Sequence, residues 1–232
     1  MSSAASTIDQ DEIQNFAKDS SHWWDLDGPF AILHRLNPVR LDYILSHVGD
    51  VKGKSILDIG CGGGLVCEPL ARLGAQVTGV DADTQAIEIA QAHGEGLDIT
   101  YINGAAEDLQ QQFDIVLALE IIEHVANPAL FVQQVSKLVK PGGVVIFSTL
   151  NRTAKSFALG IVAAEYITRW VPRGTHDWKK FIKPSELAKM VRPADLTTED
   201  ITGLYYKPVE GEFVLSKDHL AVNYFMTAHK EA

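Results

Sequence analysis

The sequence predicts an α/β fold in which a mostly parallel sheet carries helices on both faces. From residue 55 onward, short apolar runs alternate with stretches of helical spacing, and each run ends in a turn signal. Alternation of this kind is typical of parallel strands, since the helix between two strands returns the chain to the same end of the sheet. After residue 151 the alternation stops, and two strand-like stretches close the chain.

Seven strands account for the pattern. The apolar runs that predict parallel strands are 55–59, 76–80, 99–102, 113–119 and 144–148, and the helical stretches are 65–73, 84–93, 128–139 and 184–191. The closing stretches, 200–206 and 221–229, are expected to pair as an antiparallel edge. Before the first strand, residues 11–47 have helical spacing with two expected breaks, at Asp27-Gly28-Pro29 and at Asn37-Pro38.

The length of 232 residues fits one large domain. We expect a helical extension or lid over residues 1–50 and a ligand-binding core over 51–152. A basic, apolar insertion then follows over 153–183, and residues 184–232 are expected to complete the same domain.

Charge and composition exclude several classes of protein. The chain has 20 basic and 30 acidic residues, and the resulting net charge of −10 disfavours nucleic acid as a partner. Two cysteines form at most one disulfide. The N-terminus lacks the pattern of a secretory signal, and no apolar run is long enough to span a bilayer. We therefore expect a cytoplasmic protein.

The strongest motif is an apolar strand that runs directly into Gly60, Gly62 and Gly64. Glycines at this place let the backbone approach a ligand closely at the start of the next helix. Asp81 ends the next expected strand, where a carboxylate can accept hydrogen bonds from both hydroxyls of a ribose. A plain tight turn is the alternative interpretation.

The register of the glycines separates two kinds of nucleoside cofactor. A dinucleotide fingerprint that starts at Gly60 needs Gly or Ala at position 65, where this chain has Leu65. Asp58 precedes the loop, and its carboxylate suits a ligand with an ammonium group and repels a pyrophosphate. We therefore predict S-adenosylmethionine as the cofactor, with its ribose on Asp81 and its amino-acid end near the loop.

Four successive motifs, LDIGCGGG, GVDAD, FDIVLALEIIEHV and LVKPGGVVIFSTLNR, resemble those of class I S-adenosylmethionine-dependent methyltransferases. The flanking stretches SSHWWDLDGPFAILHRLNPVRLDYI and NRTAKSFALGIVAAEYITRWVPRGTHDWKKFIKP resemble the ubiquinone-biosynthesis O-methyltransferase family. The resemblance implies a Rossmann-like class I methyltransferase fold and methylation of polyprenylated phenol or catechol intermediates. It also makes other quinone-biosynthesis enzymes candidate partners.

The resemblance further implies which residues contact the cofactor. It assigns this role to Arg40, Gly60, Asp81 and the apolar Leu119, and it places Glu107 near the adenine. A guanidinium at Arg40 can pair bidentately with the cofactor's carboxylate, although a solvated helix arginine is the alternative.

Glu120, Glu123 and His124 follow directly on the fourth expected strand. If this segment is helical, the three side chains share one face at the ligand-binding end of the sheet. They then form a candidate site for Mg²⁺ or another divalent cation, which would hold both oxygens of a catechol. Two alternatives stay open: His124 as a general base without a metal, and an ordinary helix N-terminus.

The insertion combines positive charge with apolar side chains. Residues 151–183 contain seven basic and two acidic residues, a local charge of +5, around a nearly apolar stretch at 157–171. Such a segment is typical of helices that lie in an anionic bilayer interface, and a buried helix is the alternative. We expect peripheral association with the inner membrane face, from which the enzyme would draw its polyprenylated acceptor.

Three other functions remain possible from the sequence. They are methylation of another small aromatic acceptor, a nicotinamide dehydrogenase disfavoured by Leu65 and Asp58, and a lipid-binding module without activity. The aromatic residues that can line an acceptor cavity are Phe16, Trp23, Trp24 and Tyr166.

Overall fold

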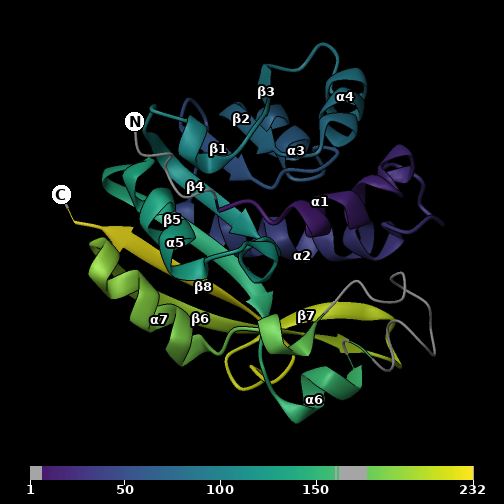
Figure 1. Cartoon of the computed structure of the whole chain (residues 1–232), viewed down its shortest axis with the longest axis vertical. Coiled ribbons are helices and arrows are strands. Elements are labelled where there is room, and N and C mark those ends of the chain that lie inside the picture. Colours follow the sequence, from purple (N-terminus) through teal and green to yellow (C-terminus); the bar gives the residue numbers. More distant parts are fainter. Residues whose placement is uncertain (1–6, 160, 162–176, 232) are drawn as a thin grey trace.

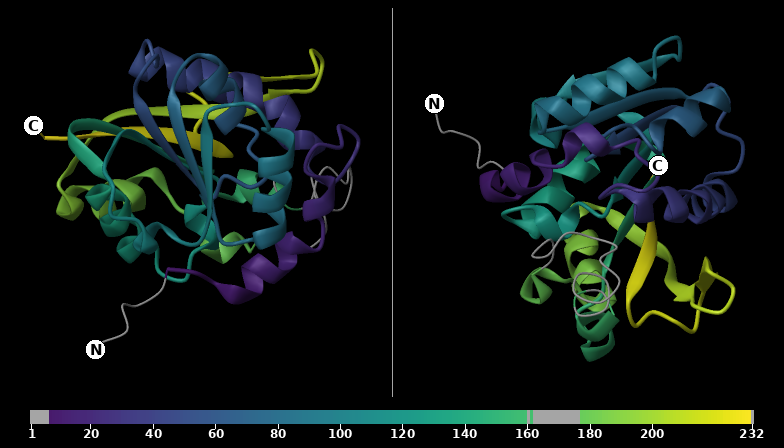
Figure 2. Two further views of the ribbon diagram at one scale, coloured as in Figure 1. Left: turned by 90° about the horizontal axis from the view of Figure 1, so that it is seen from above. Right: turned by 90° about the vertical axis from the view of Figure 1, so that its right-hand side faces the viewer.

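One twisted eight-stranded sheet, in the order β3-β2-β1-β4-β5-β8-β6-β7, organises the computed structural model of the chain. The structure describes residues 7–159, 161 and 177–231. Helices lie on both sides of the sheet (Figure 1, Figure 2). The sequence predicted this arrangement.

The strands are β1 (Ser55–Ile59), β2 (Gln76–Asp81), β3 (Ile99–Asn103), β4 (Phe113–Leu119), β5 (Val139–Leu150), β6 (Leu196–Lys207), β7 (Glu212–Ser216) and β8 (Asn223–Lys230). The α-helices are α1 (Gln10–Ala17), α2 (Ala31–Val48), α3 (Cys67–Arg72), α4 (Thr84–His93), α5 (Pro128–Lys137), α6 (Ala154–Ser156) and α7 (Pro184–Val191). Single 3₁₀ turns are η1 (Ser20–His22), η2 (Ala106–Asp108), η3 (Ile122–His124), η5 (Trp178–Lys180) and η6 (Arg192–Ala194).

The sheet is parallel on one side and antiparallel on the other. Strands β1 to β5 pair in parallel, as their alternation with helices predicted. β8 pairs antiparallel with β5 and β6, and β6 pairs antiparallel with β7. The predicted seven strands miss β7, which has only five residues, none of them buried, and pairs with β6 alone.

The core consists of two apolar clusters, one on each face of the sheet. Alternate residues of β4 point to opposite faces, as expected for a pleated strand. Val116 packs with side chains of α5 and α7, whereas Leu117 packs with side chains of α2, α3 and α4. Both residues are fully buried.

The N-terminal region contains one of the two predicted breaks. Residues 27–29 separate η1 from α2, as predicted. The break expected at Asn37-Pro38 is wrong, because α2 continues through Pro38. Proline removes one helical hydrogen bond. The helix tolerates this loss because Leu36, Tyr43 and Ile44 bury its apolar side against the core.

Most of the apolar stretch expected at 157–171 lies outside the described residues, together with Tyr166. Within the described part, Phe157 and Leu159 are each 47% exposed. Among the described residues, no helix has the length and apolar character needed to cross a membrane.

Candidate active site

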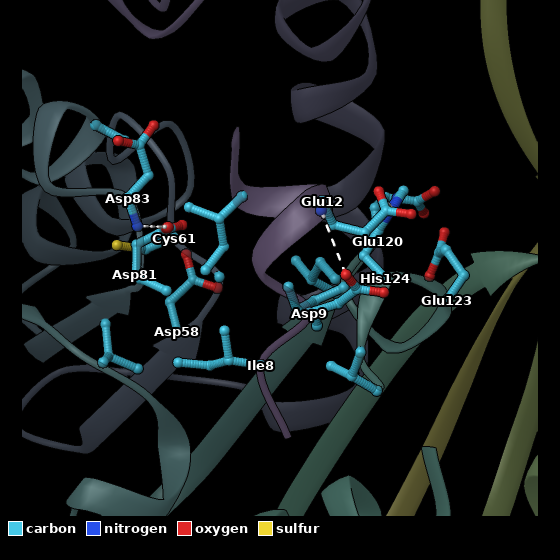
Figure 3. A pocket seen from close by; sticks show the side chains of 18 of the residues that line it. Ile8, Asp9, Glu12, Asp58, Cys61, Asp81, Asp83, Glu120, Glu123 and His124 are labelled. Atoms are coloured by element: carbon cyan, nitrogen blue, oxygen red, sulfur yellow. Dashed lines mark hydrogen bonds and ion pairs between the residues drawn. The ribbon is translucent and has the colours of Figure 1, made fainter. Parts of the chain in front are cut away.

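A cavity of about 380 Å³ opens at the carboxyl ends of β1, β2 and β4. Its volume lies in the usual range for small-molecule sites, and its place is the one that open α/β sheets use for ligands. All predicted site residues except Gly62 and Glu107 line it. Figure 3 shows Asp58, Cys61 and Asp81 on one side of the cavity and Glu120, Glu123 and His124 on the other.

The glycine loop has a backbone that only glycine adopts readily. Gly60, Gly62 and Gly64 have φ angles of 75°, 50° and 86°. A Cβ atom on Gly62 would lie 2.3 Å from the ring of Trp23, which packs directly on the loop. The sequence predicted that a ligand approaches this loop; in the structure, the group in contact with Gly62 is this tryptophan.

Asp81 is fixed by the loop and by the turn that follows it. The backbone N–H of Gly62 donates to Oδ2 of Asp81 at 2.8 Å, and that of Asp83 donates to Oδ1 at 2.9 Å. Burial raises the pKa of Asp81, although these backbone donors oppose the shift. Each carboxylate oxygen keeps a further lone pair, so Asp81 can still accept hydrogen bonds from a ribose.

Arg40 is the most informative cation of the cavity. Its side chain comes from α2, the residue is 5% exposed, and Nε is buried without a hydrogen-bond partner. Burial lowers the pKa of Arg40, while the charges of Glu120 and Asp58 oppose that shift. A buried cation of this kind needs an anion, and a ligand carboxylate at this place fits.

Asp58 lies on β1 and is 3% exposed. Burial raises its pKa to about 7, against the opposing effects of Cys67 and Arg40. The thiol of Cys67 donates to Oδ2 of Asp58 at 3.4 Å. Cys61 and Cys67 are both free, buried thiols.

Glu120, Glu123 and His124 do not share a helical face. Glu120 has a φ of 52°, a left-handed conformation that turns the chain immediately after β4. Only residues 122–124 form a turn of 3₁₀ helix, η3. The condition behind the predicted helical face is therefore not met, although all three side chains reach the cavity.

Each of the two glutamates is bonded to the neighbouring strands. Glu120 accepts from the hydroxyl of Ser148 at 2.7 Å and from the amide of Asn223 at 3.0 and 3.1 Å. Glu123 is 3% exposed and accepts from Thr149 at 2.8 Å. Burial and the nearby Glu120 raise the pKa of Glu123.

His124 is held by the N-terminal helix. Its Nδ1 lies 3.0 Å from Oε2 of Glu12 on α1, and its side chain is 9% exposed. Burial alone would lower the pKa of His124, but the hydrogen bond with Glu12 and the charge of Glu123 outweigh burial and raise it. Sequence reasoning missed Glu12, since 112 residues separate it from His124.

The described residues do not fit the predicted cation. Among residues 7–159, 161 and 177–231, no three His, Cys, Asp or Glu side chains are grouped so that they could hold a metal ion. Glu120, Glu123 and His124 each engage different partners. We therefore derive no chemical step through Mg²⁺.

The other predicted residues have distinct places. Leu119 lines the cavity at the end of β4. The carboxylate of Glu107 accepts from the backbone N–H and the hydroxyl of Thr7, both at 2.7 Å, and so ties the N-terminal segment to η2. Trp23 lines the cavity, whereas Trp24 stacks on His93 with ring centroids 3.5 Å apart. The side chain of Phe16 lies outside the described part.

Comparisons with known proteins identify the family of the chain. A family described as a methyltransferase domain matches residues 32–201. The ubiquinone biosynthesis O-methyltransferase of Maricaulis maris is 47% identical, over 97% of this chain and 94% of that protein. The ubiquinone biosynthesis O-methyltransferase of Idiomarina loihiensis is 48% identical, over 96% of this chain and 94% of that protein.

Solved structures show the same fold at lower identity. Magnesium protoporphyrin IX methyltransferase from Synechocystis PCC 6803, with bound S-adenosylhomocysteine, superposes with a TM-score of 0.68 at 17% identity. The match covers 96% of this chain and 97% of that one. A possible histamine N-methyltransferase from Thermotoga maritima has a TM-score of 0.67 at 18% identity, over 95% and 99% of the two chains.

The fold, the matched domain and the cavity define a class I S-adenosylmethionine-dependent methyltransferase. Within that class, the two full-length relatives decide the family. The chain belongs to the ubiquinone biosynthesis O-methyltransferases.

Proposed function

We propose that the protein transfers the methyl group of S-adenosylmethionine to a phenolic oxygen of a polyprenylated phenol or catechol in ubiquinone biosynthesis. The observation that carries the proposal is the buried, unpartnered Nε of Arg40, in a cavity that also presents Asp58 and Asp81. One cation and two separated carboxylates complement the carboxylate, the ammonium group and the ribose of this cofactor.

Three contacts would hold the cofactor. Arg40 binds its carboxylate, Asp58 binds its ammonium group, and Asp81 accepts from the ribose hydroxyls. When bound, the cofactor supplies a methyl group on a sulfonium, which is already a good leaving group. The protein must therefore align the acceptor oxygen, exclude water and remove the phenolic proton.

We assign the removal of the phenolic proton to His124, which lines the cavity on the side opposite Asp58. An imidazole is the usual general base near neutral pH, and a phenolate is a far better nucleophile than a phenol. The acceptor ring would lie against the apolar part of the lining, which includes Ile13, Phe30, Leu33 and Val125.

We further propose that the protein associates peripherally with an anionic membrane at its inner face. The exposed Phe157 and Leu159 lie at the start of the apolar stretch of the insertion, and the local charge of +5 over residues 151–183 would attract acidic lipids. Each basic side chain near such a surface contributes up to about 1 kcal/mol.

Vesicle binding tests the membrane proposal. The protein should co-sediment with phosphatidylglycerol vesicles, less so at high salt, and hardly at all with phosphatidylcholine alone. Replacing Lys179 and Lys183 by Glu should weaken sedimentation and leave cofactor binding unchanged. Equal sedimentation of variant and wild type would reject the proposal.

Turnover with radiolabelled S-adenosylmethionine and a panel of catechols tests the reaction. We expect label on a phenolic oxygen, and a loss on the order of 100-fold or more in His124→Ala. The same assay in excess chelator separates two chemistries. Proton transfer to His124 needs no cation, whereas loss restored by Mg²⁺ would assign activation of the phenol to a metal. Absence of O-methylated product with every acceptor would reject the function.

A further inference from the structure

Trp23 and Trp24 both contact the glycine loop, but their indole N–H groups differ in hydrogen bonding. Nε1 of Trp24 donates to the carbonyl oxygen of Gly63 at 3.0 Å. Nε1 of Trp23 is buried and has no hydrogen-bond partner among the described residues. A buried donor without an acceptor costs free energy, so such a group in a ligand cavity points to an acceptor on the ligand. The reaction proposed above gives Trp23 no role.

Both faces of the Trp23 ring are covered by the protein. One face stacks on Phe30, with ring centroids 3.9 Å apart and an angle of 3° between the planes. The other face lies against Gly62, since a Cβ atom there would be 2.3, 2.4 and 3.0 Å from three consecutive atoms of the six-membered ring. Trp23 nevertheless lines the cavity. A ligand can therefore meet only the edge of the ring, which carries Nε1.

The surrounding contacts fix the position of this edge. Nε2 of His34 on α2 lies 2.8 Å from the carbonyl oxygen of Trp23. Ser20, fully buried in η1, donates to Asp83, and the backbone N–H of Asp83 donates to Asp81. The segment that carries Trp23 is thus tied to the turn that holds Asp81. Its indole N–H is in place before a ligand binds, which lowers the entropic cost of using it.

We propose that Nε1 of Trp23 donates to the carboxylate of S-adenosylmethionine, which it shares with Arg40. The inference rests on the proposed function for the cofactor contacts but not for the acceptor. Among the described residues that line the cavity, the buried donors without a hydrogen-bond partner are Nε of Arg40 and Nε1 of Trp23. The two oxygens of one carboxylate can accept from both donors, and a hydrogen bond to a charged acceptor is about twice as strong as one to a neutral acceptor.

Calorimetry with two ligands separates this role from packing. S-adenosylhomocysteine carries the carboxylate, and methylthioadenosine has the same nucleoside and a thioether without it. Trp23→Phe keeps an aromatic ring on the loop and removes the N–H group. It should weaken binding of S-adenosylhomocysteine by roughly 10-fold to 100-fold more than binding of methylthioadenosine, as expected for the loss of a hydrogen bond to a charged group.

Trp24→Phe is the matched control, because the N–H of Trp24 already donates to Gly63. The same substitution there can disturb the loop but removes no donor that a ligand needs, so any loss should be equal for the two ligands. Equal losses for both ligands in Trp23→Phe, or a selective loss of the same size in Trp24→Phe, would overturn the inference. Urea unfolding without ligand measures the effect of each substitution on the fold.

NMR of the indole N–H groups provides a readout on the wild-type protein. Adding S-adenosylhomocysteine should move the Nε1–H signal of Trp23 downfield, because the group then donates to a carboxylate, and methylthioadenosine should move it far less. An equal shift with both ligands, or no shift with S-adenosylhomocysteine, would overturn the inference even if Trp23→Phe does not fold. Failure to methylate any phenol would reject the proposed function and leave these binding results as they are.

Discussion

Replacing Asp58 by asparagine should stabilise the protein above neutral pH and weaken its hold on the cofactor. Asp58 is 3% exposed, and burial raises its pKa from 3.8 to about 7. The ionised carboxylate therefore destabilises the folded protein. An asparagine has nearly the same shape and carries no charge.

The size and sign of the effect follow from proton linkage. Below pH 3.8, both the folded and the unfolded states hold the proton, and Asp58 contributes no pH dependence. Between pH 3.8 and about 7, the unfolded state loses the proton while the folded state keeps it, so wild-type stability falls as pH rises. The difference between the two pKa values corresponds to about 4 kcal/mol, reached above pH 7.

Urea unfolding without cofactor, at about pH 5, 6, 7 and 8, measures the difference between Asp58→Asn and wild type. The advantage of the variant should grow with pH and level off near the raised pKa. Asp195→Asn, the same change at an exposed residue, is the control and should show a far smaller trend. A stability difference that stays constant over this range would refute the reasoning. Calorimetry should show weaker binding of S-adenosylhomocysteine by Asp58→Asn, by roughly 1–3 kcal/mol.

Further variants test the rest of the cofactor side. Asp81→Ala should weaken binding of both S-adenosylhomocysteine and methylthioadenosine by roughly 1–3 kcal/mol, because both carry the ribose. Arg40→Gln should weaken binding of S-adenosylhomocysteine only, since methylthioadenosine has no carboxylate. Equal calorimetric losses for both ligands would contradict the assignment of Arg40 to the cofactor's carboxylate. Gly62→Ala should lower the free energy of unfolding by roughly 1–3 kcal/mol more than Gly49→Ala. Both glycines have positive φ, but a Cβ meets the Trp23 ring only at Gly62, and equal losses in urea unfolding would argue against the clash.

Local patterns in the sequence were enough to predict most of the fold. The helices expected at 84–93 and 184–191 have those bounds in the structure, and the five parallel strands are present. Both predictions depend on apolar spacing and turn residues close together in the chain. The sequence analysis missed β7 because its apolar run, Phe213 to Leu215, is only three residues long and shows no alternation. The break predicted at Pro38 was wrong because the packing of α2 against the core outweighs the loss of one helical hydrogen bond.

From spacing and topology, the site was predictable only as far as its residues adjoin strand ends, whereas Arg40 on α2 was predicted from the family resemblance. Asp58, Asp81 and Leu119 end or lie in strands, so the topology alone brings them to the cavity. The φ of 52° at Glu120 gives no sequence signal in a glutamate and redirects the segment that follows. The contact between Glu12 and His124 forms only through the tertiary fold, which no spacing rule reveals.

The change of strand direction at β5 divides the cavity wall between two structural supports. The carboxylates assigned to the cofactor, Asp58 and Asp81, stand on the parallel strands β1 and β2. Glu120, on the opposite wall, is anchored to Ser148 of β5 and Asn223 of β8, in the antiparallel part. Substitutions along β8 would therefore act first on Glu120, whereas Asp58 and Asp81 have their supports on other strands. The two sides of the cavity thus have separate structural supports within one sheet.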